Sequence, residues 1–283
     1  MSISLTGGAS HSRDPALPGQ APRTMLEVTG LSKVYGAGEH QTQALDDLSF
    51  TVREGELVCV VGPSGCGKTT LLKTLSGLMA PSGGHVDLLG QRVTSPPEMM
   101  ALVFQDYSRS LYPWMKVQAN VALPLRRMDL SNDERHDRVA DALESVSLAG
   151  VADKYPWQLS GGMQQRVAIA RALAYRPGVL LMDEPFASVD AQTRANLEDL
   201  VLDLRHRYDV TIIFVTHDID ESVYLADRVV VLTPRPATVR EIVDIDLPRP
   251  RDQIRTKELP TFARLRSHVY ELIMNVSARG HGS

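Results

Sequence analysis

The chain has 283 residues, 43% of them hydrophobic and 23% charged, a composition that excludes a wholly disordered or fibrous protein. Its formal charge of −4 and pI of about 6.1 argue against a broadly basic surface, so we expect no nucleic-acid partner. It has only two cysteines, no apolar stretch near the ~20 residues that cross a bilayer and no secretory signal pattern, which favours a reducing compartment and a chain that does not cross a membrane by itself.

The N-terminal part of the chain predicts a leader followed by strands. Residues 1–24 are rich in Gly, Ser and Pro without a periodic apolar face, so we expect a disordered leader there. Alternating apolar residues predict a strand from Met25 and another over residues 48–52. Leu57–Val61 is a continuous apolar run, and three of its five residues are β-branched. Such a run is typical of a strand buried on both faces of a parallel sheet.

Three apolar stripes at helical spacing follow. The first comes after Ser131 and Glu134, which have the spacing of a capping box. The stripes consist of Val139, Leu143 and Val146; of Met163, Val167, Ala170 and Ala174; and of Leu197, Leu200, Val201 and Leu204. Further strands are predicted over residues 179–182, 210–216 and 229–232.

This alternation of strands and helices predicts an α/β domain with a mainly parallel sheet, over residues 25–245. Residues 90–155 contain helical patterns but no convincing buried strand, so we expect a helical insertion over about residues 90–165. A tail over residues 246–283 contains a Pro/Arg-rich segment and then an amphipathic helix, which we expect to pack on its own domain. The apolar stripe of that helix is Phe262, Leu265, Val269, Leu272 and Val276.

A phosphate-binding loop follows the predicted strand Leu57–Val61. Residues 62–69, GPSGCGKT, match the pattern G-x-x-x-x-G-K-[ST] and lead into a helical run. Glycines allow a tight turn whose N–H groups point at phosphate oxygens, and Lys68 can reach the β- and γ-phosphates. The hydroxyl of Thr69 can bind Mg²⁺. The predicted nucleotide-binding residues are Gly62, Pro63, Ser64, Gly65, Cys66, Gly67, Lys68, Thr69 and Thr70.

A second apolar run ends in two carboxylates. The predicted strand over residues 179–182 delivers Asp183 and Glu184 at its carboxyl end, where α/β folds place their ligands. Asp183 would hold Mg²⁺ directly or through water, and Glu184 could polarise an attacking water. An apolar run that ends in Asp-Glu is common by itself, but together with the loop at Gly62 it favours a catalytic role.

The segment that distinguishes one class of phosphate-loop protein from another is LSGGMQQR, residues 159–166. Ser160, Gly161 and Gly162 present a hydroxyl and free N–H groups at a helix start, which is an anion-binding arrangement. The segment resembles the signature motif of the ABC transporter family, and residues 25–232 resemble its nucleotide-binding subunit. The resemblance implies ATP and Mg²⁺ as cofactors. It also implies a P-loop NTPase fold with an N-terminal antiparallel β subdomain and a helical signature subdomain.

The resemblance also implies roles for four more residues. Tyr35 resembles the aromatic residue that stacks on adenine, and Gln105 the glutamine that touches Mg²⁺ or the attacking water. Asp190 resembles the residue of the loop that communicates between two ATP sites, and His217 the histidine that contacts the γ-phosphate. The implied catalytic residues are Glu184, His217, Gln105 and Lys68, and the implied metal ligands are Thr69, Gln105 and Asp183.

Partners follow from the same resemblance. Two copies would form a head-to-tail dimer in which Ser160 and Gly162 of one copy act on the nucleotide of the other. An integral membrane permease would dock beside Gln105, a solute-binding protein would act indirectly, and the chain would lie peripherally on the cytoplasmic face of a bacterial inner membrane. Residues 104–126 and 247–272 resemble nitrate/sulfonate/taurine importers. The candidate permease contacts are Tyr107, Leu111, Tyr112 and Trp114, and a local core of the helical insertion is the alternative.

Three other functions stay open at this point. A soluble ABC-type ATPase of DNA repair or translation usually has two cassettes or a long coiled coil, and this chain has neither. A small-molecule kinase would not need the LSGGMQQR segment together with Glu184 and His217. A nucleotide-gated scaffold would dimerise with ATP but would not hydrolyse it.

Overall fold

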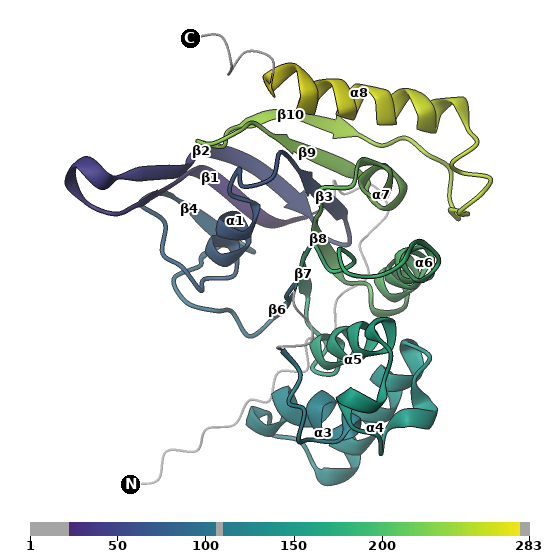
Figure 1. The fold of residues 1–283 in the computed structure, drawn as a ribbon. Helices are drawn as coiled ribbons and strands as arrows, with labels where there is room; N and C mark the ends of the chain where they lie inside the picture. The colour runs from purple at the N-terminus through teal and green to yellow at the C-terminus, as the bar shows by residue number, and fades with distance from the viewer. Residues whose placement is uncertain (1–22, 106–109, 278–283) are drawn as a thin grey trace, which may run out of the picture.

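The computed structural model describes residues 23–105 and 110–277, so most of the expected leader and Tyr107 lie outside the described residues. Two sheets stack on one another, and a helical lobe lies below them in Figure 1. The first sheet is antiparallel, has the order β2-β1-β4-β5, and forms the expected N-terminal β subdomain. Its strands are β1 (Thr24–Tyr35), β2 (Thr42–Arg53), β4 (Gly83–Leu88) and β5 (Gln91–Arg92), with the 3₁₀ helix η1 (Gly38–His40) between β1 and β2.

The central sheet has the order β10-β9-β3-β8-β7-β6, and only the β10–β9 pair is antiparallel. The expected mainly parallel sheet is therefore confirmed. Because parallel strands point the same way, the carboxyl ends of β3, β7 and β8 lie at one edge, where the loops that follow them can meet. The strands are β3 (Leu57–Val61), β6 (Met100–Val103), β7 (Val179–Asp183), β8 (Thr211–Val215), β9 (Arg228–Leu232) and β10 (Val239–Asp244).

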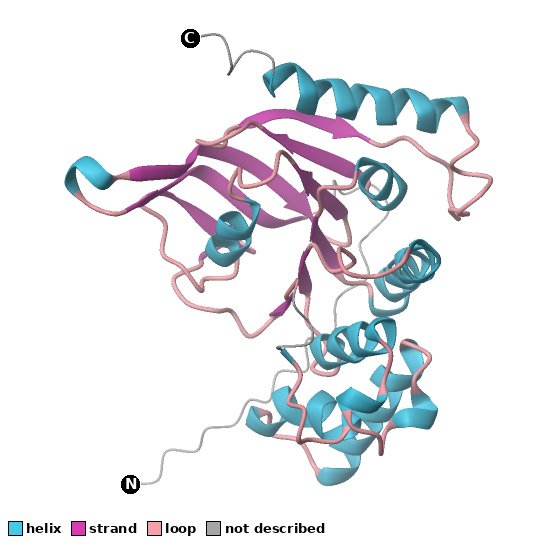
Figure 2. Cartoon of the chain, viewed as in Figure 1, coloured by secondary structure: helices cyan, strands magenta, loops and turns pink. Residues whose placement is uncertain are grey.

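Helices cover the sheet and form the separate lobe (Figure 2). We use "helical lobe" for α3, α4 and α5 with the 3₁₀ helices between them. The helices are α1 (Lys68–Leu75), α3 (Val117–Ala122), α4 (Asn132–Ser145), α5 (Gly161–Leu173), α6 (Ala191–Tyr208), α7 (Ile219–Leu225) and α8 (Pro260–Ser277). The 3₁₀ helices of the lobe are η2 (Leu123–Arg127), η3 (Ala149–Val151) and η4 (Pro156–Gln158). Among the described helices, none is both long enough and apolar enough to cross a bilayer.

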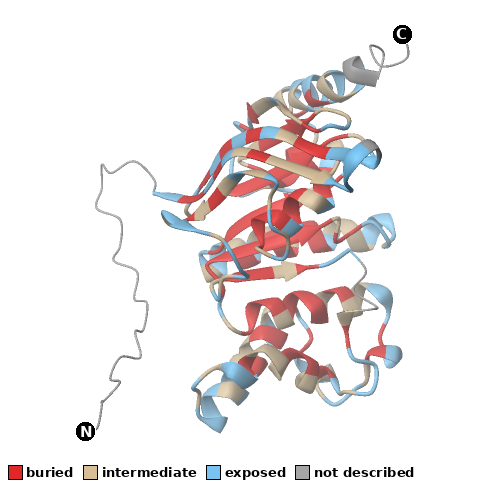
Figure 3. Cartoon of the chain, turned by 90° about the vertical axis from the view of Figure 1, so that its left-hand side faces the viewer, coloured by how far each residue is buried: buried red, intermediate tan, exposed pale blue. Residues whose placement is uncertain are grey.

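Strand β3 is buried on both faces, as its sequence predicts. Leu57, Cys59 and Val61 belong to the core cluster shared with the helices, whereas Val58 and Val60 belong to the cluster shared with the antiparallel sheet and α1. Figure 3 shows the same distribution, with buried residues concentrated in the strands and on the helix faces that contact them. The loop after β3 therefore starts from a rigid, two-sided core.

One expectation about the helical insertion is wrong. The interval 90–155 does contain a buried strand, β6, which pairs in parallel with β7 from Met100 to Val103. The strand has only four residues and lies at the edge of the sheet, so its apolar pattern is too short to distinguish it from a loop. The helical part of the interval therefore begins beyond β6 and not at residue 90.

The capping box and the tail helix are as expected. The N–H of Glu134 donates to Ser131 Oγ at 3.2 Å, and the N–H of Ser131 donates to Glu134 Oε2 at 2.8 Å, at the start of α4. Helix α8 packs against the same domain, because Phe262 and Val269 are buried in the core beside α7, β9 and β10. Figure 1 shows α8 lying along β10.

Two glycines of the β subdomain allow a matched test of backbone crowding. Both Gly84 and Gly90 have positive φ angles, +68° and +80°. A Cβ on Gly84 would lie 2.1 Å from the carbonyl oxygen of Gly30, whereas a Cβ on Gly90 would meet no atom within 4 Å. We expect Gly90→Ala to lower the free energy of unfolding by about 1 kcal/mol through the left-handed conformation alone, and Gly84→Ala by about 2–4 kcal/mol. Equal losses in denaturant titrations would contradict crowding between β1 and β4.

Candidate active site

The phosphate loop connects β3 to α1 in a conformation that requires glycine at two positions. Gly65 and Gly67 have φ angles of +73° and +125°. A Cβ on Gly67 would also lie 3.1 Å from the carbonyl oxygen of Ala44, so the loop packs directly on β2. The N–H of Cys66 donates to the carbonyl of Pro63 at 3.2 Å. The loop is thus held as a closed turn at the start of α1.

The amino group of Lys68 lies inside this turn. Its Nζ donates to the carbonyl oxygens of Gly62 at 2.9 Å and Pro63 at 3.2 Å, and the side chain is 6% exposed. The same Nζ lies 3.6 Å from Glu184 Oε1, so the ammonium group contacts both the phosphate loop and the residue that follows β7. A cation fixed at this place can attract the phosphates of a nucleotide.

Two side chains whose oxygen atoms could bind a metal ion, Thr69 and Asp183, lie together between α1 and β7. The hydroxyl of Thr69 donates to Asp183 Oδ1 at 3.5 Å, at the limit of a hydrogen bond. Burial raises the pKa of Asp183, and the hydrogen bond from Thr69 partly opposes this rise. Within residues 23–105 and 110–277 no cluster of three His, Cys, Asp or Glu forms a complete metal site. A hydroxyl and one carboxylate suit Mg²⁺, which takes oxygen ligands and completes its shell with phosphates and water.

Glu184 receives contacts from three other segments of the chain. Its carboxylate lies 3.4 Å from Gln105 Nε2 after β6, 2.9 Å from His217 Nδ1 after β8, and 3.6 Å from Lys68 Nζ. The backbone of Glu184 has a φ angle of +41°, and its N–H donates to the carbonyl of Val215. A non-glycine residue in the left-handed region is strained, and such strain is concentrated at functional sites.

Tyr35 lies at the outer side of the same site. Its hydroxyl is 3.1 Å from the hydroxyl of Thr70 in α1 and 3.2 Å from the sulfur of Met79. The ring is 37% exposed, and the ammonium group of Lys33 lies 5.6 Å from its centroid. Strand β1 therefore places an accessible aromatic face next to the helix that follows the phosphate loop.

The residues of the LSGGMQQR segment lie apart from this cluster. Ser160 caps α5 by accepting the N–H of Met163 at 3.4 Å, and Gly161 is the first residue of the helix. Figure 1 shows α5 in the helical lobe, away from α1. A Cβ on Gly162 would lie 2.6 Å from Cγ2 of Thr193, so this end of α5 packs against the first turn of α6.

Asp190 is connected to the LSGGMQQR segment through Thr193, the residue on which Gly162 packs. It caps α6 by accepting the N–H of Thr193 at 3.0 Å and the Thr193 hydroxyl at 2.7 Å. These two hydrogen bonds lower the pKa of Asp190, so its carboxylate is ionised at neutral pH. Thr193 is a residue that the sequence analysis did not select, and its only sequence signal is its position three residues after Asp190.

Three more residues adjoin His217 and were also not selected. Asp218 caps α7 by accepting the N–H of Glu221 at 3.1 Å, and its Oδ2 lies 2.9 Å from Arg194 Nη1 on α6. Glu221 is 4% exposed, and burial raises its pKa to about 8. An Asp three residues before a Glu is the sequence signal that could have indicated the cap at Asp218, but its pairing with Arg194 depends on the packing of α6 on α7.

The site combines a strand–loop–helix around a lysine with two oxygen ligands for a metal ion and with a carboxylate that contacts a histidine and a glutamine. This combination defines a nucleotide-hydrolysing P-loop protein. The chain matches the family described as ABC transporter over residues 45–187. The protein belongs to this family, as an ATP-binding cassette with ATPase activity.

Individual relatives agree with this assignment. The aliphatic sulfonates import ATP-binding protein SsuB of Bacillus licheniformis is 42% identical over 244 residues, which cover 86% of this chain and 92% of that protein. The bicarbonate transport ATP-binding protein CmpD of Synechococcus elongatus is 42% identical over 264 residues, or 92% and 94% of the two chains. A dimeric structure of the ATP-binding cassette MJ0796 in a post-hydrolysis state with ADP and Pi superimposes with a TM-score of 0.69 at 32% identity, covering 78% of this chain and 99% of that one.

The carboxylate of Glu184 can be tested by an isosteric change. We expect Glu184→Gln to slow ATP hydrolysis by about 10²–10⁴-fold, the usual contribution of a general base, and to leave ATP binding nearly unchanged. Phosphate release and equilibrium nucleotide binding are the two measurements. Glu27→Gln, an exposed position on β1, is the control. Full hydrolysis by Glu184→Gln would show that another group activates the water.

Cys66 offers a chemical test of the phosphate loop. Burial raises the pKa of its thiol, and the side chain is 1% exposed, so we expect slow alkylation by iodoacetamide that accelerates as the pH rises toward that raised pKa. Cys66 Sγ fills the space beside Gly62, where an added Cβ would lie only 3.1 Å from it, and the residue is buried, so a group added to the sulfur would displace the loop. Alkylated protein should therefore fail to bind ATP. Cys66→Ala, treated in the same way, should still bind it. Mass spectrometry quantifies the modification, and ATP binding by fully alkylated protein would contradict the packing.

Proposed function

We propose that the protein is the ATP-hydrolysing subunit of an importer that moves a small anion through a separate membrane permease. The observation that carries this proposal is the combination of the Glu184 cluster with an exposed aromatic groove beside Gln105. The names of SsuB and CmpD support the import of small anions, sulfonates in one case and bicarbonate in the other. Nitrate, sulfonate or taurine stays our proposal for the solute class.

Within one copy, the clustered residues divide the work of hydrolysis. Lys68 and the loop N–H groups would bind the phosphates, and Thr69 with Asp183 would hold Mg²⁺, which offsets phosphate charge when bound. Glu184 would orient or deprotonate the attacking water, and Gln105 contacts the carboxylate of Glu184. His217 would hold the γ-phosphate. Tyr35 would stack on the adenine, next to Thr70.

The signature residues would act on a second copy. Ser160, Gly161 and Gly162 stand at the start of α5, in the lobe that is separate from the phosphate loop, so they are free to face a partner's nucleotide. A head-to-tail dimer would use the binding free energy of two ATP molecules to close, and hydrolysis would remove it. Asp190, which packs next to Gly162 through Thr193, would link the two sites. A monomer alone should therefore hydrolyse ATP poorly.

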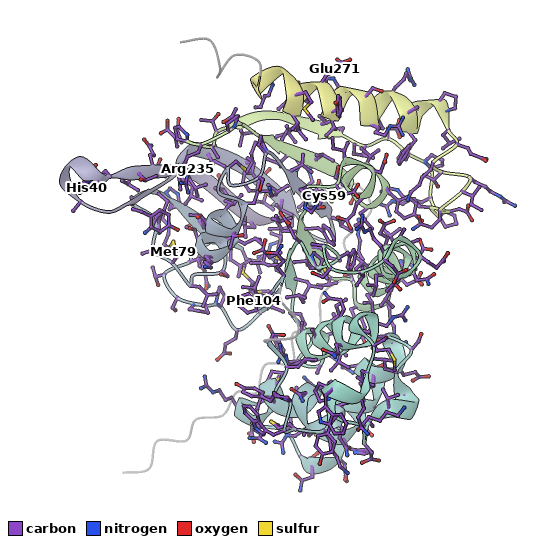
Figure 4. All side chains as sticks on the ribbon, viewed as in Figure 1. His40, Cys59, Met79, Phe104, Arg235 and Glu271 are labelled. Carbon is purple, nitrogen blue, oxygen red and sulfur yellow. The ribbon has the colours of Figure 1, made fainter. Side chains whose placement is uncertain are left out.

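The proposed permease site is a groove of about 610 Å³ between the sheet edge and the helical lobe. Its walls include Phe104 directly before Gln105, Tyr112 and Tyr175, and Figure 4 labels Phe104 at the junction of the two parts. Phe104 is 44% exposed, Tyr112 40% and the adjacent Trp114 71%. Exposed aromatic residues in a groove are typical of interaction surfaces.

A buried asparagine positions this aromatic surface. Asn120 accepts the N–H of Tyr112 at 2.8 Å and donates to the carbonyls of Tyr112, Met115 and Lys116, so it fixes the loop that presents Tyr112 and Trp114. The two rings contact one another with centroids 5.2 Å apart. Leu111, by contrast, is 3% exposed and belongs to the core. The expected cluster is therefore divided between a surface pair and a core residue.

The direct test of the proposed function is a detergent pull-down of the tagged protein from its native membranes. Recovery of a polytopic permease supports the importer proposal and the peripheral position on the cytoplasmic face of the inner membrane. A solute-binding protein encoded with that permease would then define the anion. Recovery with ribosomes, DNA or soluble proteins alone would instead support a soluble ABC-type ATPase, with the ATP site unchanged.

The docking groove gives a specific prediction. Tyr112→Ala, in the groove, and Trp114→Ala, beside it, should each weaken association with permease-containing membranes by about tenfold or more, as expected for exposed aromatic anchors. Co-sedimentation with membrane vesicles measures this effect. Tyr270→Ala is the matched control, because Tyr270 is 51% exposed on α8 at a different surface. Unchanged membrane association of both variants would remove the groove from the proposal.

A further inference from the structure

The Pro/Arg-rich tail contains a short segment, residues 249–257, that crosses from α7 to α6 and that we name the strap. It is outside residues 45–187, the part of the chain that matches the family. The strap is folded by its own side chains: Asp252 Oδ1 accepts the N–H groups of Ile254 at 3.0 Å and Arg255 at 2.8 Å, and the N–H of Asp252 donates to the hydroxyl of Thr256 at 2.8 Å. It is therefore an ordered turn and not a linker.

The strap holds the carboxyl end of α7. Arg251 donates through both terminal nitrogens, to the carbonyl of Tyr224 and, at 2.6 Å, to that of Ala226. These carbonyls lie at the end of the helix, where a cation is favourable. The ammonium group of Lys257 lies 4.8 Å from the centroid of the Tyr224 ring, so a second cation of the strap covers the same turn.

The strap also holds the middle of α6. Gln253 Nε2 lies within hydrogen-bond distance of the carbonyl of Ala195 and of two carboxylates, Glu198 Oε2 and Asp199 Oδ1, both at 2.9 Å. Lys257 Nζ lies 3.4 Å from the same Glu198 oxygen. Glu198 is 3% exposed, and a carboxylate so deeply buried is costly without such partners.

The two helices held by the strap lead directly to the active site. Helix α7 begins two residues after His217, with Asp218 between them as its cap, and α6 begins directly after Asp190. Near the site the helices are joined by the ion pair of Arg194 with Asp218, at 2.9 Å. Farther away they are joined by the hydroxyl of Tyr224, which donates to Asp199 at 2.6 Å, and by the strap. The pair α6–α7 is thus fixed at both ends.

We propose that the strap is a positioning element for ATP hydrolysis: through Gln253 and Lys257 it fixes α7 against α6 and so holds His217 in contact with Glu184. Without the strap, and among the hydrogen bonds and ion pairs of the described residues, the Arg194–Asp218 pair and the Tyr224–Asp199 hydrogen bond would remain between α7 and α6, in addition to the apolar packing of the two helices. The 2.9 Å contact of His217 Nδ1 with Glu184 Oε2 would then vary with the tilt of α7. The contacts of Arg251, Gln253 and Lys257 lie on α6 and on the end of α7, away from Lys68 and Glu184, so we expect the strap to act on the chemical step through His217.

The test uses the full chain and measures ATP turnover of the purified protein, so it does not depend on any permease. Lys257→Met and Gln253→Leu should each lower kcat by about tenfold at an unchanged KM for ATP, because a displaced catalytic group slows the chemical step more than binding. Lys257→Arg keeps the positive charge and should restore most of the rate. Arg255→Met, an exposed position of the same strap, should leave turnover unchanged.

A double-mutant cycle separates positioning from a general loss of stability. In a His217→Ala background, Lys257→Met should have no further effect on the residual turnover, because the group that it positions is absent. A tenfold loss in both backgrounds would overturn the proposal, as would a rise in the KM for ATP with kcat unchanged. If Lys257→Met does not fold, as judged by thermal unfolding, Gln253→Leu carries the same cycle with the same two outcomes.

Discussion

The contact between the carboxylate of Glu184 and the imidazole of His217 is the constraint on which the rest of the site depends. Four segments that are far apart in the sequence converge there: the phosphate loop through Lys68, β6 through Gln105, β7 through Glu184 itself and β8 through His217. They can converge because β6, β7, β8 and β3 are parallel neighbours in one sheet. The left-handed backbone of Glu184 shows that the surrounding structure imposes this position on the residue.

The same arrangement places the Glu184 cluster directly beside the groove between the sheet and the helical lobe. Phe104 lines the groove between the sheet and the helical lobe, and the next residue, Gln105, contacts Glu184. One peptide unit therefore connects the two surfaces. On the other side of the site, Gly162 packs on Thr193, so a rotation of the helical lobe must be accommodated at the first turn of α6. Interfaces of this kind have discrete arrangements because they are closely packed.

The sequence allowed correct prediction where the determinants are local. Strand β3 followed from five consecutive apolar residues, the turn of the phosphate loop from its glycines, and the start of α4 from Ser131 and Glu134. The placement of Glu184 at a strand end could be predicted for the same reason. These features depend on residues within a few positions of each other, so a single chain is enough to recognise them.

The features that were not predicted depend on partners distant in the sequence. Strand β6 is recognisable only by its pairing with β7, because four residues at a sheet edge carry little pattern. From the sequence, the strap is recognisable only as part of a Pro/Arg-rich segment, because Gln253 meets its carboxylate partner Glu198 55 residues away in the chain. The ion pair of Arg194 with Asp218 likewise forms only when α6 and α7 are packed together, so it could not be predicted from local sequence.

The placement of the tryptophans has a consequence for how the molecule can be observed. The chain has two: Trp157 lies in η4 of the helical lobe and Trp114 lies just before α3, and they are 68% and 71% exposed. Trp157 stacks on Tyr155 just before Ser160, and Trp114 lies beside Tyr112. Neither indole is part of the Glu184 cluster. Selective excitation of the tryptophans therefore observes the helical lobe and the segment before it, and a change in their emission on adding nucleotide reports a rearrangement away from the Glu184 cluster.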